Sequence, residues 1–438
     1  PSKDNVTGGK MTTEEKMTID ERRKYLRTMK SRYRKADRTT KGQLLDEMEA
    51  VTSLHRKSLI RLMNGDLIRK PRRREREQSY RADVDDALRV IDESFDSICP
   101  ERLTPNLAWM AHHLGRHGEL QATEGLLDQL GSISISTVRR RLNRIRQDQP
   151  RLPRREPGGR SRWLQDVPMK RLSWDLEDPG HFETDLVHHC GPTASGEYLC
   201  TLQMIDVATG WSERRAVLGR SYLVMKDAFL VLLTHLPFPV KEIHPDNGSE
   251  FLSHHMLRFW GDRVQGVTLS RSRPYHKNDN PRVEQKNSTL VRAYLGRERL
   301  DTVDQVLAVN RLYDKMWVYY NLFQPVMHLV EKQIIRNDDQ TTRVRRTHDK
   351  ARTPFDRLCD TEAILPTHRE QLQALRNGIN PRQLRSEIYD DINAIFKLPC
   401  AEPGSTQNVH HTLGTRLEQE KEPLSNLAFN RTPVTPQA

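Results

Sequence analysis

The stretch that decides the fold is residues 244–251, which read HPDNGSEF. It follows an apolar segment ending at Ile243, so the pattern predicts a strand that runs into a tight Asn-Gly turn. Such a turn places Asp246 at the end of a buried strand, with its carboxylate at a surface cleft. Aspartate is also common in ordinary turns, so the stretch indicates chemistry only if other carboxylates join it.

The surrounding sequence predicts a mixed sheet covered by helices. Strands are expected at 181–189, 197–209, 211–218, 239–248 and 264–274, and helices at 221–236 and 249–262. Three strands in a row followed by alternating helix and strand are typical of such a sheet.

A further helix is expected to begin at Asn280, which suits the N-cap, with Pro281 in the first helical position. Glu284 then lies one turn in, on a stripe that continues through Ser288, Val291 and Leu295. We expect this stripe to face the sheet. An apolar helix is predicted at 303–323.

Three carboxylates would meet at one edge of this sheet. Asp185 projects from the middle of the first strand, and Asp246 lies at the end of the fourth. Glu284 lies in the first turn of the helix that follows the fifth strand. Two carboxylates about 4 Å apart repel by roughly 4 kcal/mol at an effective dielectric of about 20, so a divalent cation is needed to hold them ionised. Hard oxygen ligands favour Mg²⁺ or Mn²⁺, and two such ions suit phosphodiester chemistry.

Four stretches carry a family resemblance: FETDLVHHCG, YLCTLQMIDVATGWSE, IHPDNGSEF and RPYHKNDNPRVEQKN. They resemble the catalytic core of DDE-type integrases and transposases, closest to bacterial insertion-sequence transposases, over about 173–330. The resemblance implies an α/β ribonuclease H-like core with a mixed five-stranded sheet. It also implies that Asp185, Asp246 and Glu284 hold two Mg²⁺ ions, that water nicks the element's ends, and that the freed 3′-hydroxyl attacks target DNA.

All-α helix-turn-helix domains are expected to precede this core. The first has a basic helix, then Leu44, Leu45 and Met48 at helical spacing, then a helix capped by Ser53. The second ends in a helix with one apolar stripe, Ile135, Val138, Leu142 and Ile145. Candidate DNA-binding residues are Lys57, Arg61, Arg139, Arg140 and Arg144, with Lys277 and Lys286 beside Glu284. Solvated basic faces and solvated lysines are the plainer alternative.

These patterns divide the chain into seven parts. They are a disordered N-terminus at 1–18, helix-turn-helix domains at 19–78 and 79–148, a basic linker at 149–172, the catalytic core at 173–332, a basic and helical region at 333–400, and a disordered tail at 401–438.

Composition restricts the partners. The 438 residues carry a formal charge of +12, which favours a polyanion, here double-stranded DNA. The longest apolar run, 228–240, is too short to cross a membrane, and we expect no membrane partner. The cysteines are far apart with no Cys-x-x-Cys pair, which fits a reducing cytosol. The resemblance implies a bacterial, cytoplasmic protein associated with the nucleoid. Joining two DNA ends implies a homo-oligomer.

Several residues have a second interpretation. Glu284 could be an N-terminal helix acid. Asp185 has rivals in Asp175, Glu183 and Asp206, of which Asp206 suits the turn between the second and third strands. Glu250 suits a helix N-terminus better than a metal site. The run His188, His189 and Cys190 suggests zinc, but adjacent strand residues face opposite ways, so structural histidines are expected.

The sequence thus predicts a Mg²⁺-dependent DNA transposase or integrase that binds terminal inverted repeats, cuts 3′ ends and transfers strands. Two alternatives stay open. One is a metal-dependent nuclease of the same fold that cuts DNA without joining it. The other is a DNA-binding regulator with a non-catalytic core.

Overall fold

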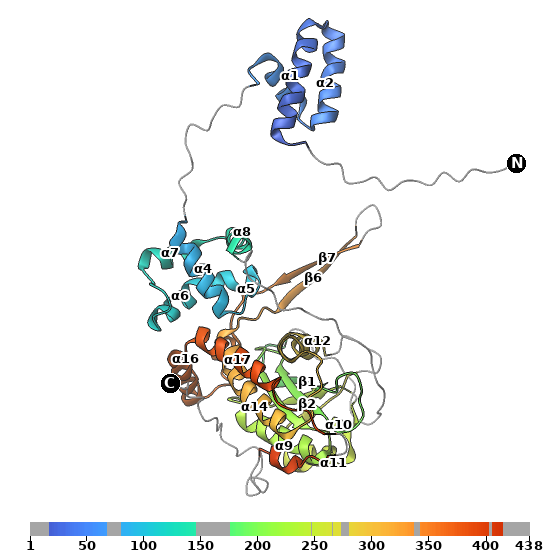
Figure 1. Cartoon of the computed structure of the whole chain (residues 1–438), viewed down its shortest axis with the longest axis vertical. Helices are drawn as coiled ribbons and strands as arrows, with labels where there is room; N and C mark the ends of the chain where they lie inside the picture. Colours follow the sequence, from blue (N-terminus) through green and yellow to red (C-terminus); the bar gives the residue numbers. More distant parts are fainter. Residues whose placement is uncertain are drawn as a thin grey trace, which may run out of the picture. The chain divides into compact units, whose positions relative to one another are not determined.

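A computed structural model describes residues 17–67, 80–145, 176–246, 248–264, 266–272, 280–336, 342–402 and 405–414. The chain forms two compact units, residues 1–79 and 80–438 (Figure 1). In the described ranges, no helix combines the length and the apolar character that a membrane crossing requires.

The first unit is a three-helix structure made of α1 (Ile19–Lys35), α2 (Arg38–Thr52) and α3 (Arg56–Asn64). Thr18 caps α1 in a capping box with Glu21. The apolar sides of the helices meet in a small core that consists of Leu26, Met29, Tyr33, Leu44, Leu45, Met48, Leu59, Met63 and Leu67. The three expected helices are therefore present.

The predicted N-cap of the third helix is wrong. Ser53 instead ends α2, in the left-handed conformation (φ 55°), and its N–H still bonds the Glu49 carbonyl. His55 caps α3, because its Nδ1 accepts from the Lys57 N–H at 3.2 Å. The third helix therefore begins two residues later than a cap at Ser53 would place it.

The second unit starts with a group of helices. These are α4 (Ala82–Ser94), α5 (Pro100–Leu103), η1 (Thr104–Asn106), α6 (Leu107–Arg116), α7 (Glu124–Ser132) and α8 (Ile135–Ile145). Val138 and Leu142 of the α8 stripe are buried, whereas Ile135 at its start is 40% exposed. The stripe therefore packs in its middle and frays at its first residue.

A five-stranded sheet in the order β3-β2-β1-β4-β5 is the centre of this unit (Figure 1). Its strands are β1 (His181–His188), β2 (Leu199–Asp206), β3 (Ser212–Leu218), β4 (Glu242–Pro245) and β5 (Thr268–Leu269). β2 runs antiparallel to both β1 and β3, and β1, β4 and β5 run parallel to one another. The predicted mixed five-stranded sheet is confirmed.

Helices follow the strands as predicted, except that Ser253 divides the single helix expected at 249–262 into two. They are α9 (Tyr222–His235), α10 (Ser249–Leu252), α11 (His254–Arg263), α12 (Pro281–Lys286), the π-helix η3 (Asn287–Arg292), α13 (Ala293–Leu295), α14 (Val303–Val318) and the π-helix η4 (Tyr319–Phe323). Two asparagines close the outer edge of β3. Asn310 bonds both backbone groups of Ala216, and Asn321 does the same for Ser212. This covers an edge that would otherwise be open to another chain.

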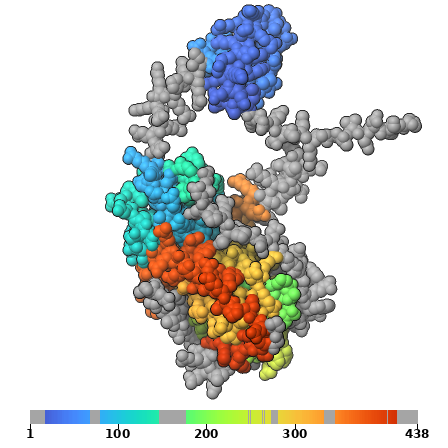
Figure 2. Space-filling model, viewed as in Figure 1, coloured from blue at the N-terminus to red at the C-terminus, as the bar shows by residue number. Residues whose placement is uncertain are grey.

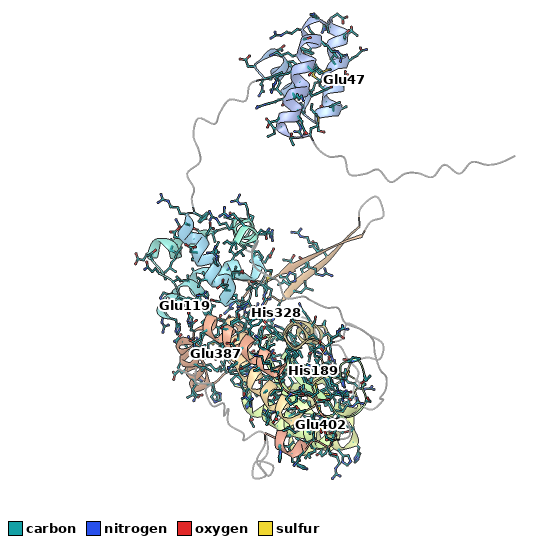
Figure 3. All side chains as sticks on the ribbon, in the orientation of Figure 1. Glu47, Glu119, His189, His328, Glu387 and Glu402 are labelled. Atoms are coloured by element: carbon teal, nitrogen blue, oxygen red, sulfur yellow. The ribbon has the colours of Figure 1, made fainter. Side chains whose placement is uncertain are left out.

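The helices of 80–145 share one hydrophobic core with the C-terminal helices and the sheet. The C-terminal helices are α15 (Pro354–Cys359), α16 (Pro366–Gly378) and α17 (Pro381–Ile395), and α17 packs on both α4 and α14. Arg382 bonds Glu93 at 2.9 Å and Glu119 at 2.8 Å (Glu119 is labelled in Figure 3). In Figure 2 the two groups of helices are in contact. The predicted basic linker of 149–172 lies outside the described residues.

Residues 333–400 differ from the two helices expected there. They hold three helices and most of a hairpin, β6 (Leu329–Arg336) and β7 (Thr342–His348), which forms a separate two-stranded sheet. The hairpin projects away from the body of the unit (Figure 1).

Part of the expected disordered tail belongs to the described structure. Residues 405–414 include the short helix η5 (Val409–Thr412), and Gly414 donates from its backbone to Asp227 at 2.9 Å. Gln407 accepts from the Val303 N–H at 3.1 Å. The expectation of disorder is wrong for residues 405–414, because they bond to residues far away in the sequence. Residues 415–438, like residues 1–16 of the expected N-terminal disorder, lie outside the described residues.

Candidate active site

Parallel pairing of β1 and β4 brings Asp185 and Asp246 together. Their register places Thr184 opposite Pro245, so the two aspartates follow at the same level of neighbouring strands. Asp185 also lies opposite Gln203 of β2, inside the sheet. The two carboxylates therefore meet where β4 ends.

Both aspartates are held as weak acids. Burial, together with the charges of Asp246, Glu284 and Glu250, raises the pKa of Asp185 to about 8. Burial and the charges of Glu250 and Glu284 likewise raise the pKa of Asp246 to about 6. These acids thus repel one another, which is the electrostatic condition that a bound cation reverses.

Glu284 lies on the exposed first turn of α12, and its charge reaches both aspartates. The helix begins as predicted, with Asn280 at the N-cap and Pro281 at the first position. The expected stripe forms only in its second half: Val291 and Leu295 are buried, while Ser288 is exposed. The π-helix η3 lies between Glu284 and Leu295, and its wider turn changes the spacing of the stripe there.

Glu183 fastens this helix to the sheet. Its carboxylate is fully buried and accepts from the backbone N–H groups of Arg282 at 2.7 Å and Val283 at 2.9 Å. The Arg282 guanidinium adds a third bond at 3.1 Å. Glu183 therefore neutralises the first-turn donors of α12 and positions Glu284. The sequence places Glu183 on the strand face of Asp185, but only the packing shows this role.

Asn287 makes a second connection between this helix and β1. Its Nδ2 donates to Oδ2 of Asp185 at 2.6 Å, and the Leu186 N–H donates to Oδ1 at 2.8 Å. One Asp185 oxygen is thus directed by the same helical segment that carries Glu284. The sequence contains no signal for this bond, because the π-helical turn sets where Asn287 points.

A polar row continues inward from Asp185 across the sheet. Gln203 lies opposite Asp185, and Arg214 of β3 lies opposite Gln203. Within the described residues, both amide atoms of Gln203 and all three guanidinium nitrogens of Arg214 are buried without a hydrogen-bond partner. The rings of Tyr313 and Tyr320 lie 5.7 and 5.3 Å from the Arg214 guanidinium. Cation–π attraction thus partly replaces the lost hydration of Arg214.

Gly248 keeps two carboxylates close together. A Cβ at this position would meet Cδ of Glu250 at 2.7 Å, its Oε1 at 2.8 Å, and Oδ1 of Asp246 at 2.9 Å. The Gly248 N–H also donates to Oδ1 of Asp246 at 2.9 Å. Glu250 belongs to the first turn of α10, as expected, but its charge reaches the aspartates as well.

The other candidates near the strands have structural partners. Asp206 accepts from the backbone of Gly180 and Thr209, both at 2.8 Å, which confirms its turn role. His189, labelled in Figure 3, is buried and bonds Thr201 at 3.0 Å. Its burial lowers the pKa to about 3, so the ring stays neutral. Asp175 lies outside the described residues.

The candidate DNA-binding residues have varied surroundings. Lys57 and Arg61 are exposed on α3, and Arg140 is exposed on α8. Arg139 pairs with Glu101, and Arg144 pairs with Asp85 at 2.6 Å. The Arg139–Glu101 pair is exposed, so a phosphate could replace Glu101 at little cost. Asp85 is only 22% exposed and also pairs with Arg141, so it is held more firmly.

The two lysines beside Glu284 differ. Lys277 lies outside the described residues. Burial and the charges of Arg102 and Arg214 lower the pKa of Lys286 to about 7.

The donor set fits a hard divalent cation in part. Asp185 and Asp246 supply carboxylate oxygens side by side, and their raised pKa values show the repulsion that such an ion relieves. Among the described residues, however, no three His, Cys, Asp or Glu side chains form a group that could hold a metal ion. Glu284 is thus near the pair without completing a three-residue cluster.

Comparison with known proteins identifies a relative. The uncharacterized protein y4rM of Sinorhizobium fredii is 36% identical to this chain over 302 residues, which cover 69% of this chain and 86% of y4rM. This chain belongs to the y4rM family. No family model matches it.

One solved structure overlaps part of this y4rM-family chain. It is the catalytic core domain of BIV integrase, with 19% identity and a TM-score of 0.24, covering 32% of this chain and 83% of that domain.

Proposed function

We propose that this protein is a DDE-type polynucleotidyl transferase with a ribonuclease H-like core, a transposase or integrase of a mobile element. The observation that carries the proposal is the meeting of Asp185 and Asp246 at the ends of parallel neighbours β1 and β4, with Glu284 near both. Two mutually repelling carboxylates at a strand end are costly for the fold. Carboxylates whose pKa values are raised in this way are typical of catalytic sites, and a metal-dependent reaction would use them.

Asp185 and Asp246 would hold Mg²⁺ or Mn²⁺, two ions in the full site, with Glu284 as the third ligand. Divalent cations bound there would supply Lewis-acid chemistry toward a phosphodiester. Glu183 and Asn287 set the position of α12 on β1, and α12 carries Glu284. The carboxylates of the three elements would hold the ions, and the ions would contact the reacting phosphodiester.

The reaction consists of two displacements at phosphorus. In the first, a water oxygen bonds to phosphorus, the bond to the 3′ oxygen breaks, and that oxygen takes up a proton. In the second, the freed 3′ oxygen loses its proton and attacks a target phosphodiester, so one P–O bond forms as another breaks. Neither step needs an oxidant or a nucleotide cofactor.

DNA recognition would come from the helical parts. The α3 face with Lys57 and Arg61 and the α8 face with Arg140 present basic residues to solvent, as a recognition helix in a major groove does. Arg139, Arg144, Lys277 and Lys286 are the further candidates for phosphate contact. We propose helix-turn-helix binding of the terminal inverted repeats, paired ends held by a homo-oligomer, and action on the bacterial nucleoid.

A strand-transfer assay tests this function. The probe is a labelled duplex taken from the DNA that flanks the coding region and carries matched inverted repeats, incubated with Mg²⁺ and a supercoiled target. Joined product supports a transposase, cutting without joining supports a nuclease, and binding alone supports a regulator.

Variants make the assay specific for the proposed site. Asp246→Asn and Glu284→Gln should abolish both chemical steps and leave duplex affinity within about twofold. Affinity should fall on the order of a thousandfold between about 50 and 200 mM salt if six or more phosphates are contacted. Full activity in the Asp246→Asn protein would exclude the proposed mechanism.

A further inference from the structure

Two helix pairs of this chain repeat the same arrangement of residues. The first pair is α2 and α3 in the first unit, and the second pair is α7 and α8 in the second unit. Both pairs have a short connection, residues 53–55 in the first and residues 133–134 in the second. Such a connection between two helices is typical of a helix-turn-helix motif.

The first helices of the two pairs carry matching sequences. Residues 44–48 read LLDEM, and residues 126–130 read LLDQL. The first and last residues of both stretches are buried: Leu44, Met48, Leu126 and Leu130. The matching residues therefore have the same structural role, which is to pack each helix into the hydrophobic core of its own unit.

The buried positions of the second helices match as well. Counted from the first residue of each helix, the fourth and eighth side chains are at most 1% exposed: Leu59 and Met63 in α3, Val138 and Leu142 in α8. A helix turns by about 100° per residue, so the sixth and ninth residues lie on its opposite side. The packing thus presents the same two positions of each helix to solvent.

These outward positions hold identical residues in the two helices. The sixth residue is Arg61 in α3 and Arg140 in α8, and the ninth is Asn64 in α3 and Asn143 in α8. All four side chains are exposed. Within the described residues, none of the four side chains makes a hydrogen bond or an ion pair. Each helix therefore offers the same arginine and asparagine to a ligand.

Other basic residues of the same helices are held by the protein itself. Arg56 pairs with Asp46 of α2, and Arg141 pairs with Asp85 of α4. These ion pairs attach each second helix to a neighbour inside its own unit. The exposed arginine at the sixth position is therefore distinct from the basic residues that stabilise the fold.

The exposed pair suits the edges of neighbouring bases in a major groove. Residues three apart on a helix lie side by side, about 4.5 Å apart along the axis, which is close to the spacing of about 3.4 Å between stacked bases. An arginine guanidinium donates to O6 and N7 of guanine. An asparagine amide accepts from N6 of adenine and donates to N7.

An acidic protein surface fits this pair less well than DNA does. Carboxylates would attract the two arginines, but they do not require the same neutral amide beside each of them. The major-groove edge of adenine does match an amide, because it presents one donor and one acceptor side by side. The repeated asparagine therefore favours a base edge as the ligand.

We propose that α3 and α8 read the same base pattern, a guanine bonded by the arginine and a neighbouring adenine bonded by the asparagine. The DNA that this protein recognises then contains two copies of that pattern, one for each helix. This inference rests on the proposed function, because it takes double-stranded DNA as the ligand. It adds which bases are read and which side chains read them.

A selection from random-sequence duplexes tests the repeated pattern. The full-length protein is incubated with the duplex library at about 150 mM salt, and the bound duplexes are recovered and sequenced. The selected duplexes should contain two copies of a motif in which a guanine lies next to an adenine. A single motif, two unrelated motifs or the absence of any preference would overturn the proposal.

Modified bases assign each copy of the pattern to one helix. The bases 7-deazaguanine and 7-deazaadenine lack the N7 acceptor, so each should weaken binding by the unaltered protein on the order of tenfold. Arg61→Ala should make the protein insensitive to 7-deazaguanine in one copy, and Arg140→Ala should do so in the other. Asn64→Ala and Asn143→Ala should have the corresponding effects for 7-deazaadenine.

Arg89→Ala on α4 is the charge-matched control. Arg89 is exposed, pairs with Asp86 at 3.3 Å and lies outside both helix pairs, so its loss should leave the sensitivity to both modified bases unchanged. A different result would arise from contacts with phosphates. If Arg61→Ala and Arg140→Ala weaken binding to all duplexes equally, each with a salt slope smaller by about 0.9, the arginines do not read bases and the proposal fails.

Failure of the proposed function has a separate signature, which is measured by cleavage and strand transfer on the selected duplex. A protein that selects two copies of the pattern but neither cuts nor joins DNA would refute the transferase and support the base reading. Joining without preference for the repeated pattern would refute the base reading alone. Because the four replaced side chains are exposed, the melting temperature of each variant should change by no more than a few degrees.

Discussion

Asn287 donates from Nδ2 to Oδ2 of Asp185 at 2.6 Å, which joins the helical segment after Glu284 to the first strand of the sheet. Glu183, two residues before Asp185, accepts from the start of the same segment. Two adjacent same-face positions of β1 thus hold both ends of α12. The position of Glu284 relative to Asp185 depends on these bonds.

Loss of the Asn287 amide should weaken the site. Asn287→Ala is expected to lower the free energy of unfolding by about 1–3 kcal/mol, because Asp185 stays partly buried with one donor fewer. Strand transfer should fall more than tenfold. The exposed Asn143→Ala on α8 is the control and should stay within about 0.5 kcal/mol in urea denaturation. Equal effects of the two changes would argue against the connection.

The metal-free protein should lose stability as pH rises. The folded protein holds protons on Asp185 up to a pKa of about 8 and on Asp246 up to about 6, whereas the unfolded chain releases them near pH 4. Folding therefore takes up protons between about pH 4 and 8, and the free energy of unfolding falls with pH across that window.

Calorimetry at pH 5 and pH 8 measures this dependence. Asp185→Asn/Asp246→Asn should flatten it by more than about 1.4 kcal/mol, the worth of one pKa unit. Mg²⁺ should raise the melting temperature of the unaltered protein at pH 8 more than at pH 5. A double variant with the unaltered pH profile would contradict the assignment of the titrating pair.

Gly248→Ala should separate activity from stability. The backbone at this residue (φ −67°, ψ 137°) is allowed for alanine, but the new methyl group would displace the carboxylates of Asp246 and Glu250. Activity should drop on the order of a hundredfold, as a misplacement of about 1 Å costs. Unfolding free energy should fall by about 1–3 kcal/mol.

Gly261→Ala is the matched control for that change. Open space surrounds Gly261 on α11, so alanine should stabilise the helix by about 0.5–1 kcal/mol and leave strand transfer unchanged. Similar loss of activity in both variants would indicate a general effect of the added methyl group.

The segment 401–414 should contribute to stability. Ala401 donates to Asp301 at 2.8 Å, and Gly414 to Asp227 at 2.9 Å, from opposite ends of the segment. A chain ending at Cys400 should unfold with about 2–4 kcal/mol less free energy, at about 1 kcal/mol for each lost bond. A chain ending at Gly414 should match the full length. If the two truncations are equally stable, the segment does not hold the fold.

Local patterns predicted the elements whose cause is local. Asn280 and Pro281 start α12 as their chemistry requires, and the strand pattern around Ile243 predicted β4. Features set by packing were missed. The clamp by Glu183, the π-helical turn at Asn287 and the docking of Gly414 all depend on partners from other parts of the chain.

The hairpin was missed for a different reason. Its basic residues indicated charge, but the pairing of Lys332 with Arg346 is a register that a run of cations does not specify. The prediction that Ser53 caps the third helix was wrong because His55 caps the N-terminus of that helix instead.

The π-helical turn at Asn287–Arg292 has a consequence for sequence length. A wider turn accommodates one residue more than a regular helix of equal rise. Deletion of a single residue there would restore ordinary helical winding and rotate either Asn287 away from Asp185 or Leu295 out of the core. Relatives that shorten this turn would therefore need a different donor for the first aspartate.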